Sequence, residues 1–135
     1  MIELTRRATF SASHFYWNDA WSPEKNEQVF GRCARRNGHG HNYTVEVTVA
    51  GEVDDTTGMV LDLKDLKAVL ESEVLQRMDH KFLNKEMPVF ATKIPTTENI
   101  AMEIWNLLAA KLPSGRLHRI RVYETDDLYV DYYGD

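Results

Sequence analysis

From Ile2 to His14 the chain alternates between apolar and polar side chains almost without a break. Even-numbered positions are mainly apolar and odd-numbered positions are mainly Ser, Thr, Glu or Arg, with Arg6 as the exception in the apolar phase. A period of two residues is typical of a strand with one buried and one exposed face. The pattern therefore predicts a long, half-buried strand in which the last residue, His14, lies on the buried side.

Similar patterns predict the remaining elements. Apolar residues recur at every second position in three later segments, and at every third or fourth position in two others. The predicted strands cover residues 41–53, 117–125 and 128–133, and the predicted helices cover residues 63–78, with Asp62 as N-cap, and 97–112, starting at Thr96 or Thr97. The order β-β-α-α-β-β packs most economically as an α+β fold, with both helices on one face of an antiparallel four-stranded sheet.

Residues 16–37 show no clear period, although they include Trp17, Trp21 and Phe30. We expect a structured loop there. Loops of this length in compact domains are usually functional, so the segment is expected to contribute to a site.

Length and composition restrict the class of protein. Of 135 residues, 43% are apolar and 27% charged, as in an ordinary globular domain, so we expect one domain over residues 1–135. The formal net charge of −5 argues against a general nucleic-acid binder. No stretch approaches the ~20 apolar residues of a membrane span, and the N-terminus lacks the apolar run of a signal peptide. We therefore expect a cytoplasmic protein without a membrane partner.

The sharpest motif is His39-Gly40-His41. In extended backbone, residues two apart point to the same side, so both imidazoles face one way. If the first two strands pair, His14 becomes a third nitrogen donor beside them. Three protein nitrogens and an open position are the pattern of a catalytic zinc site. On spacing alone, a His-x-His pair is more often a surface or structural pair, and this alternative stays open at this point.

Three further residues have a chemical and an ordinary interpretation. Cys33 is the only cysteine, so it is either a reactive thiol or a small buried hydrophobe. His80 follows the first predicted helix, where the helix dipole alone would favour it. Glu124 falls in the apolar phase of its strand, where a carboxylate needs a partner or a ligand.

With these residues identified, the chain resembles the 6-pyruvoyl-tetrahydropterin synthase and 6-carboxy-tetrahydropterin synthase family over nearly its whole length. Six motifs occur in the family's order with similar loop lengths, which makes the resemblance more specific than any one motif. The matching stretches are FSASH (10–14), GRCARRNGHGHNY (31–43), GEVDDTTGMVLDLKDLK (51–67), LQRMDHKFLN (75–84), PTTENIA (95–101) and VYETDD (122–127).

The resemblance implies a fold, an assembly and a site. The fold is the tunnelling fold, in which three subunits join their sheets into a barrel and two trimers stack as a homohexamer with active sites between subunits. The implied cofactor is Zn²⁺. Carried over residue by residue, the implied zinc ligands are His14, His39 and His41, the catalytic residues are Cys33, Asp79 and His80, and the pterin-binding residues are Thr96, Thr97, Glu98 and Glu124.

The implied activity is that of a zinc-dependent lyase that eliminates triphosphate from 7,8-dihydroneopterin triphosphate and forms 6-pyruvoyl-tetrahydropterin. A sister branch, 6-carboxy-tetrahydropterin synthase of queuosine biosynthesis, uses the same substrate and also releases acetaldehyde. That branch has a shorter spacing between the cysteine and the His-Gly-His motif, whereas Cys33 precedes His39 by six positions here, which favours the pyruvoyl product. A zinc- or pterin-binding protein without catalysis is a lesser alternative, because it would not need Cys33, Asp79 and His80 together.

A triphosphate also requires cations. Several basic residues lie near the motifs, and the sequence does not choose among them. They are Lys25, Arg32, Arg35, Arg36 and Lys81.

Overall fold

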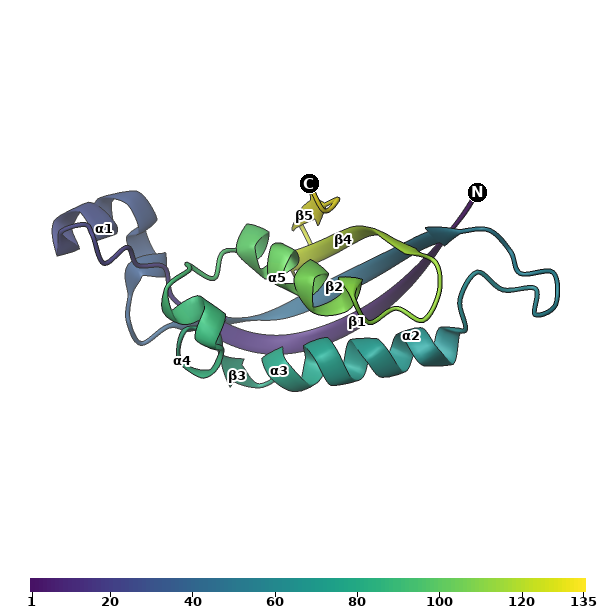
Figure 1. Ribbon diagram of the computed structural model, residues 1–135. Coiled ribbons are helices and arrows are strands. Elements are labelled where there is room, and N and C mark those ends of the chain that lie inside the picture. The colour runs from purple at the N-terminus through teal and green to yellow at the C-terminus, as the bar shows by residue number, and fades with distance from the viewer.

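A computed structural model describes residues 1–135. The strands form one sheet in the order β3-β1-β2-β4-β5 (Figure 1). The elements are β1 (Ile2–His14), α1 (Pro23–Phe30), η1 (Gly31–Ala34), β2 (His39–Gly51), α2 (Leu63–Leu70), η2 (Glu71–Leu75), α3 (Gln76–Met78), β3 (Lys81–Phe82), α4 (Leu83–Glu86), η3 (Pro88–Ala91), α5 (Thr97–Ala109), β4 (Arg116–Thr125) and β5 (Leu128–Tyr132).

The strands β1 and β2 form the longest pairing of the sheet. They are antiparallel and in register over their whole length, from Ile2 opposite Gly51 to His14 opposite His39. The predicted first strand is confirmed, and the second begins at His39 rather than at His41. Because side chains alternate between faces, this register fixes which residues of the two strands share a side.

The expectation of four antiparallel strands is wrong, because the sheet has five strands and is mixed. The additional strand β3 pairs in parallel with Ala12 and Ser13 of β1. At two residues, Lys81 and Phe82, it is too short to show a period of two, so no pattern in the sequence indicates it.

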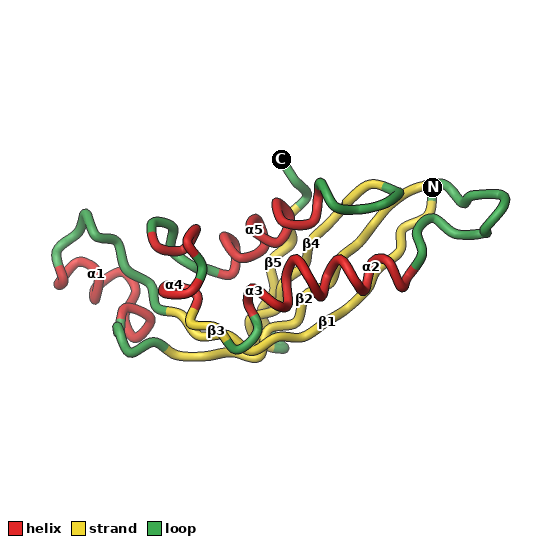
Figure 2. Tube along the Cα trace, turned by 60° about the horizontal axis from the view of Figure 1, so that its bottom comes forward, coloured by secondary structure: helices red, strands yellow, loops and turns green.

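The predicted α+β arrangement, with the main helices on one face of the sheet, is confirmed (Figures 1 and 2). The helical run α2–η2–α3 and the helix α5 pack there against the inward-facing side chains of β1, β2 and β4. As predicted, Asp62 caps α2 by accepting from the Lys64 N–H, and Thr96 caps α5 by accepting from the Asn99 N–H. No helix of the chain has the length and apolar character needed to cross a membrane.

A wide π turn, η2, interrupts the first helical run. The buried residues Leu66, Leu70, Val74 and Met78 are spaced strictly by four. In a regular α-helix of 3.6 residues per turn, each such step rotates the side chain by about 40° around the axis. One wider turn takes up part of this rotation, so all four side chains stay on the face that meets the sheet.

The segment 16–37, expected as a loop, contains the helix α1 and the 3₁₀ turn η1. Ser22 caps α1 by accepting from the Lys25 N–H, and Pro23 occupies the first turn. Asn26 is the only buried residue of the helix, and no apolar stripe marks it. Ser22 and Pro23 were the only signal of this helix in the sequence, and an interpretation based on the spacing of apolar residues misses them.

The face of the sheet opposite the helices carries paired charges. Arg7 on β1 donates from Nη2 to Glu46 Oε2 on β2 at 2.6 Å. Arg121 on β4 makes two parallel hydrogen bonds with Asp131 on β5, at 2.7 and 2.9 Å. Although this face is polar, Glu46 is only 8% exposed.

Candidate active site

Three histidines from the two long strands converge at one end of the sheet, on its helix side. His14 lies opposite His39, and Ala12 lies opposite His41. The ring centroid of His14 is 4.7 Å from that of His39 and 5.2 Å from that of His41, and the centroids of His39 and His41 are 5.0 Å apart. The predicted convergence of the imidazoles is therefore confirmed, while their role as metal ligands stays a prediction.

The His14 ring is held in one orientation. Its Nδ1 lies 2.8 Å from the Pro95 carbonyl oxygen. A carbonyl can only accept, so Nδ1 carries the proton and the Nε2 lone pair is left free, as in many metal-bound histidines. His14 is fully buried. Burial, followed by the nearby His39 and His41, lowers the pKa of His14 to about 4, although the Pro95 contact acts the other way. The ring is therefore neutral at pH 7 and able to bind a metal ion.

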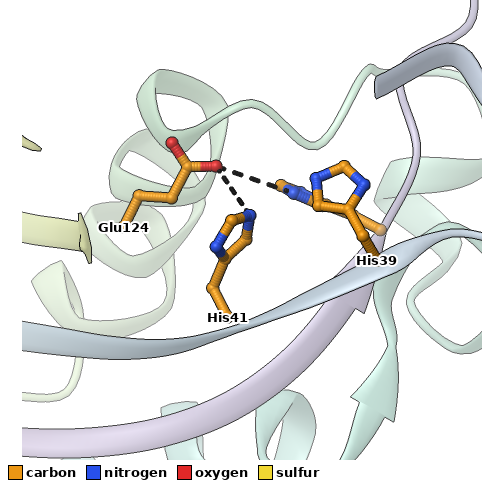
Figure 3. Close-up of side chains that lie close together, drawn as sticks. His39, His41 and Glu124 are labelled. Atoms are coloured by element: carbon orange, nitrogen blue, oxygen red, sulfur yellow. Dashed lines mark ion pairs between the residues drawn. The ribbon is translucent and has the colours of Figure 1, made fainter. Parts of the chain in front are cut away.

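Glu124 brings a carboxylate into the same cluster (Figure 3). Its Oε1 lies 3.0 Å from His41 Nε2 and 3.7 Å from His14 Nε2. Glu124 occupies an irregularity in the β4–β5 pairing, between Tyr123 opposite Tyr129 and Thr125 opposite Leu128. Such bulges redirect a side chain next to a site. The sequence placed Glu124 correctly on the buried face but gave no sign that it would reach the imidazoles.

The donor set fits a zinc ion. One donor atom from each of the three histidines and from Glu124 lies within 4.8 Å of the other three. Donors of a tetrahedral zinc with bonds of about 2.0 Å are about 3.3 Å apart, so a modest contraction suffices. In addition, His41 Nε2 is buried and makes no hydrogen bond of acceptable geometry, even though Glu124 lies near it. A buried, unpartnered nitrogen that points into a cluster of donors needs a ligand.

Cys33 lies beside this cluster. It belongs to η1, and its carbonyl oxygen accepts from the backbone N–H of Tyr16 at 2.6 Å, which fixes it close to the end of β1. Burial, and then the charge of Glu124, raise the pKa of the Cys33 thiol. In the isolated chain the thiol is therefore protonated at pH 7, and forming a thiolate requires a nearby positive charge.

Sequence reasoning missed two tyrosines in the wall of the site. The Tyr16 ring meets the His14 ring edge-on at a centroid distance of 5.0 Å, and the Tyr43 hydroxyl lies 3.2 Å from His14 Nδ1. Burial and then Glu124 raise the pKa of both phenols, so both stay protonated. Tyr43 lies in phase with His39 and His41, which was a usable signal. Tyr16 had none, because the strand pattern ends before it.

The segment from Pro95 to Glu98 reaches the cluster through its backbone. The Pro95 carbonyl orients His14, and Thr96 uses its hydroxyl to cap α5. Thr97 is 3% exposed, and Glu98 lies exposed in the first turn of the helix. Their expected role in binding a pterin stays a prediction.

Asp79 and His80 form the predicted pair, at the outer edge of β1. Asp79 Oδ1 lies 3.0 Å from His80 Nδ1 and accepts from the Ser11 N–H at 2.9 Å, and the His80 N–H donates to the Ser11 carbonyl. The Ser11 bond and then His80 lower the pKa of Asp79. His80 has a φ of 62°, which is uncommon for a residue with a side chain. No hydrogen bond or ion pair joins this pair to Cys33 or to the histidine cluster of the same chain.

Comparison with known proteins shows which family this chain belongs to. The family model described as 6-pyruvoyl tetrahydropterin synthase matches residues 3–135. The chain belongs to this family. It is 48% identical to 6-pyruvoyl tetrahydrobiopterin synthase of Homo sapiens over 98% of this chain and 92% of that protein, and 43% identical to that of Drosophila melanogaster over 97% and 79%. The structure of Caenorhabditis elegans 6-pyruvoyl tetrahydropterin synthase is 36% identical, with a TM-score of 0.95 over 99% of this chain and 96% of that one.

As a member of the 6-pyruvoyl tetrahydropterin synthase family, the chain presents its expected site residues in two places. The histidines, Cys33 and Glu124 lie together at one end of the sheet, whereas Asp79 and His80 lie at its edge. Of the basic residues, Arg36 stacks on Trp17, with its guanidinium carbon 4.3 Å from the ring centroid, and Arg32 and Arg35 are exposed.

Proposed function

We propose that the chain catalyses the zinc-dependent elimination of triphosphate from 7,8-dihydroneopterin triphosphate and forms 6-pyruvoyl-tetrahydropterin. The observation that carries this proposal is the convergence of His14, His39 and His41 next to Cys33, in a chain of this family. Bound Zn²⁺ would supply a Lewis acid that makes the protons of the substrate side chain more acidic. The remaining chemistry falls to residues of the protein.

Cys33 is proposed as the base that removes a carbon-bound proton. A thiol does this near pH 7 only when its pKa is lowered. The surroundings within one chain raise that pKa instead, through burial and Glu124. We therefore assign Asp79 and His80 of a neighbouring chain to the same site. Either the bound Zn²⁺ or the charged form of the His80 ring would supply the positive charge, and Asp79 would orient that ring, as a carboxylate does in other triads.

The edges of the sheet support such an assembly. β3 covers only Ala12 and Ser13 of β1, and Ser11 is bonded to Asp79 and His80, so the backbone groups of residues 2–10 that point to this edge have no strand partner there. The opposite edge is β5, where Leu128 and Tyr129 are 50% and 45% exposed. Open edges of this length pair with other chains. Head-to-tail pairing of the two edges generates a closed ring, as in the trimers of the proposed homohexamer. Asp79 and His80 lie at the edge where a neighbour would join.

Glu124, Thr97 and Glu98 are proposed to bind the pterin. A carboxylate accepts two parallel hydrogen bonds from the amidine edge of a pterin ring, its N–H and NH₂ groups. Glu124 is suited to this role because it is 15% exposed and no Lys or Arg side chain pairs with it. Thr97 and Glu98 start α5, and Pro95, two residues before the helix, orients His14.

The pyruvoyl product is favoured over the carboxy product. Cys33 precedes His39 by six positions, a longer spacing than in the carboxy branch, and the thiol consequently approaches the site differently. The Homo sapiens and Drosophila melanogaster relatives are both 6-pyruvoyl tetrahydrobiopterin synthases. The carboxy branch would release acetaldehyde in addition to triphosphate.

Incubation of the purified protein with 7,8-dihydroneopterin triphosphate, followed by mass spectrometry, tests the proposal. We expect one triphosphate per 6-pyruvoyl-tetrahydropterin and no aldehyde trapped by dinitrophenylhydrazine. Acetaldehyde in equal amount to triphosphate would assign the chain to the carboxy branch. An unchanged substrate, with metal bound, would favour the binding protein without catalysis.

A further inference from the structure

The side chain of Asn84 makes two hydrogen bonds just beyond the end of β1. That strand ends at His14, so the backbone groups of Phe15 have no strand partner. The Phe15 N–H donates to Asn84 Oδ1 at 2.8 Å, and Asn84 Nδ2 donates to the Phe15 carbonyl oxygen at 2.9 Å. A side-chain amide has both a donor and an acceptor, so Asn84 bonds both backbone groups of Phe15 as a neighbouring strand would.

The segment that carries Asn84 is itself held firmly. It follows β3 directly and lies beside the end of β1 (Figure 1). The adjacent residue Leu83 is fully buried in the core. Glu86 Oε2 accepts from the Phe82 N–H at 2.6 Å, which fixes the turn from β3 into α4. The amide of Asn84 is therefore presented to Phe15 from a fixed position.

The same segment carries the Asp79–His80 pair. Both residues bond the backbone of Ser11, and β3 then pairs with the next two residues of β1. Asn84 adds the last contact of this series, at Phe15. One continuous segment therefore joins the pair to the residues that follow β1.

The position of Phe15 in turn affects Cys33, because Tyr16 lies between them. The Tyr16 N–H donates to the Cys33 carbonyl oxygen at 2.6 Å. The Tyr16 ring also meets the Phe30 ring edge-on, at a centroid distance of 5.8 Å. Phe30 immediately precedes η1, the turn that contains Cys33. Tyr16 therefore holds this turn against the end of β1 through both its backbone and its ring.

We propose that Asn84 is a positioning residue for the reaction, which sets the place of the Cys33 thiol through Phe15 and Tyr16. This inference rests on the proposed function, because it assumes that Cys33 is the base. A base must lie within hydrogen-bond reach of the proton that it removes, and a displacement of about 1 Å can cost about 100-fold in rate. The Asn84 side chain bonds only Phe15, so its effect passes through the backbone.

The candidate zinc ligands are held by other contacts. The histidine of β1 lies opposite His39 in the strand register, and the Pro95 carbonyl oxygen orients its ring. His39 and His41 belong to β2. Loss of the Asn84 amide should therefore displace the thiol and leave the metal in place.

The test is a double-mutant cycle in the full chain, with Asn84→Ala, Cys33→Ala and the double variant. Ser114→Ala is the matched control, because Ser114 also bonds a distant backbone carbonyl, that of Val60 at 2.9 Å, at the opposite end of the sheet. Zinc content is measured with kcat and KM for 7,8-dihydroneopterin triphosphate. The rate of alkylation by iodoacetamide is measured at one pH, and it reports on Cys33 alone because the chain has no other cysteine.

We expect Asn84→Ala to retain its zinc and its KM and to lose about 10-fold or more in kcat. In the Cys33→Ala background the same change should leave the remaining kcat unaltered, because no thiol is left to position. Alkylation should be faster in Asn84→Ala, because the thiol is less well held and more accessible. Ser114→Ala should match the unmodified protein in every measurement.

An unchanged kcat in Asn84→Ala, or an equal loss of kcat with and without Cys33, would overturn the inference and leave the proposed function intact. An unmodified protein that forms no product would overturn the proposed function. The alkylation rates then decide whether Asn84 positions the thiol, and equal rates in Asn84→Ala and the unmodified protein reject it.

If Asn84→Ala does not fold, Asn84→Asp takes its place in the cycle. Its carboxylate still accepts from the Phe15 N–H but cannot donate to the Phe15 carbonyl oxygen. We expect a loss of kcat that again disappears in the Cys33→Ala background. Full kcat in Asn84→Asp, together with an unaltered alkylation rate, would reject the inference.

Discussion

The two faces of the sheet use polar residues in opposite ways. On the helix side, His14, His39, His41 and Glu124 gather at one end, and His41 Nε2 is left without a hydrogen bond. On the other side, Arg7 pairs with Glu46 and Arg121 with Asp131 in direct ion pairs. Apart from Asp131 on β5, both sets lie on β1, β2 and β4. The difference shows that polar atoms without a hydrogen bond mark the place where a ligand binds, whereas polar side chains that pair directly stabilise the sheet itself.

One residue is an exception on the face that carries the ion pairs (the paired face). Arg119 lies 3.5 Å from Glu46 and 3.3 Å from Thr48, yet its Nε is buried without a partner. A single unpaired donor among satisfied neighbours differs from the helix side, where several donors converge on one point. Convergence, rather than the presence of an unpaired atom, is what distinguishes the candidate site.

The largest expected effect is the loss of metal on removal of one imidazole. Changing His39 to Ala leaves two nitrogen donors and should weaken zinc binding by more than about 100-fold, with activity reduced to the detection limit. Metal content by elemental analysis and turnover of 7,8-dihydroneopterin triphosphate check this. The control is His118→Ala, because His118 lies near Glu3, with a separation of 3.7 Å, and outside the cluster. Full metal content in His39→Ala would contradict the assignment of His39 as a zinc ligand.

Removal of the Cys33 thiol should leave the metal in place and reduce turnover. The change Cys33→Ala deletes a positioned base, which is worth about 10²–10⁴-fold in rate. Steady-state kinetics and metal content, measured on the same preparation, separate the two effects. Equal turnover in the variant would show that Cys33 only packs against its neighbours. A loss of metal would indicate that the thiol itself is a ligand.

Much of this site follows from the period of the strands. The alternation from Ile2 onward places His14 on the buried side, and the spacing of His39 and His41 places both rings on one side. Their meeting then requires only that the strands pair, which the register confirms. Local patterns of this kind are readable because they depend on backbone geometry alone.

The parts that the sequence does not reveal depend on tertiary structure. The strand β3 and the π turn η2 are too short to produce a period, and the position of Glu124 depends on an irregularity between strands. Gly38 has a φ of 78°, and a Cβ there would lie 2.9 Å from the Phe82 ring, a contact between segments far apart in sequence. Such features follow from packing partners that a single sequence does not identify.

As the pH falls, the free energy of unfolding should first decrease through His14 on the helix side, and only at lower pH through the ion pairs of the paired face. The pKa of His14 is lowered to about 4, so between pH 6.5 and 4 the unfolded chain binds a proton that the folded chain does not. The free energy of unfolding is therefore complete above pH 6.5 and falls as the pH falls. At about 1.4 kcal/mol per pKa unit, the loss for the metal-free protein is about 3 kcal/mol.

Denaturation by urea at several pH values, with His14→Asn as the reference, measures this loss. The variant has no imidazole at this position, so its stability should decline less between pH 6.5 and 4. Parallel curves for the two proteins would show that His14 is protonated as easily in the folded state as in the unfolded one.

The smallest expected effect concerns the paired face. Asp131 accepts two hydrogen bonds from Arg121, which lower its pKa, and both side chains are 21% exposed. Changing Asp131 to Asn should reduce the free energy of unfolding at pH 7 by about 1 kcal/mol, because partly exposed ion pairs contribute little. The contribution of a carboxylate with a lowered pKa is present above its ordinary value of 3.8 and is lost as the pH falls below it. The difference in free energy of unfolding between Asp131→Asn and the unmodified protein should therefore persist at pH 5 and disappear only in stronger acid. At pH 5 the stability of the metal-free protein is already falling because of His14. Zinc content should not change, and a variant that lost its metal would break the separation between the two faces.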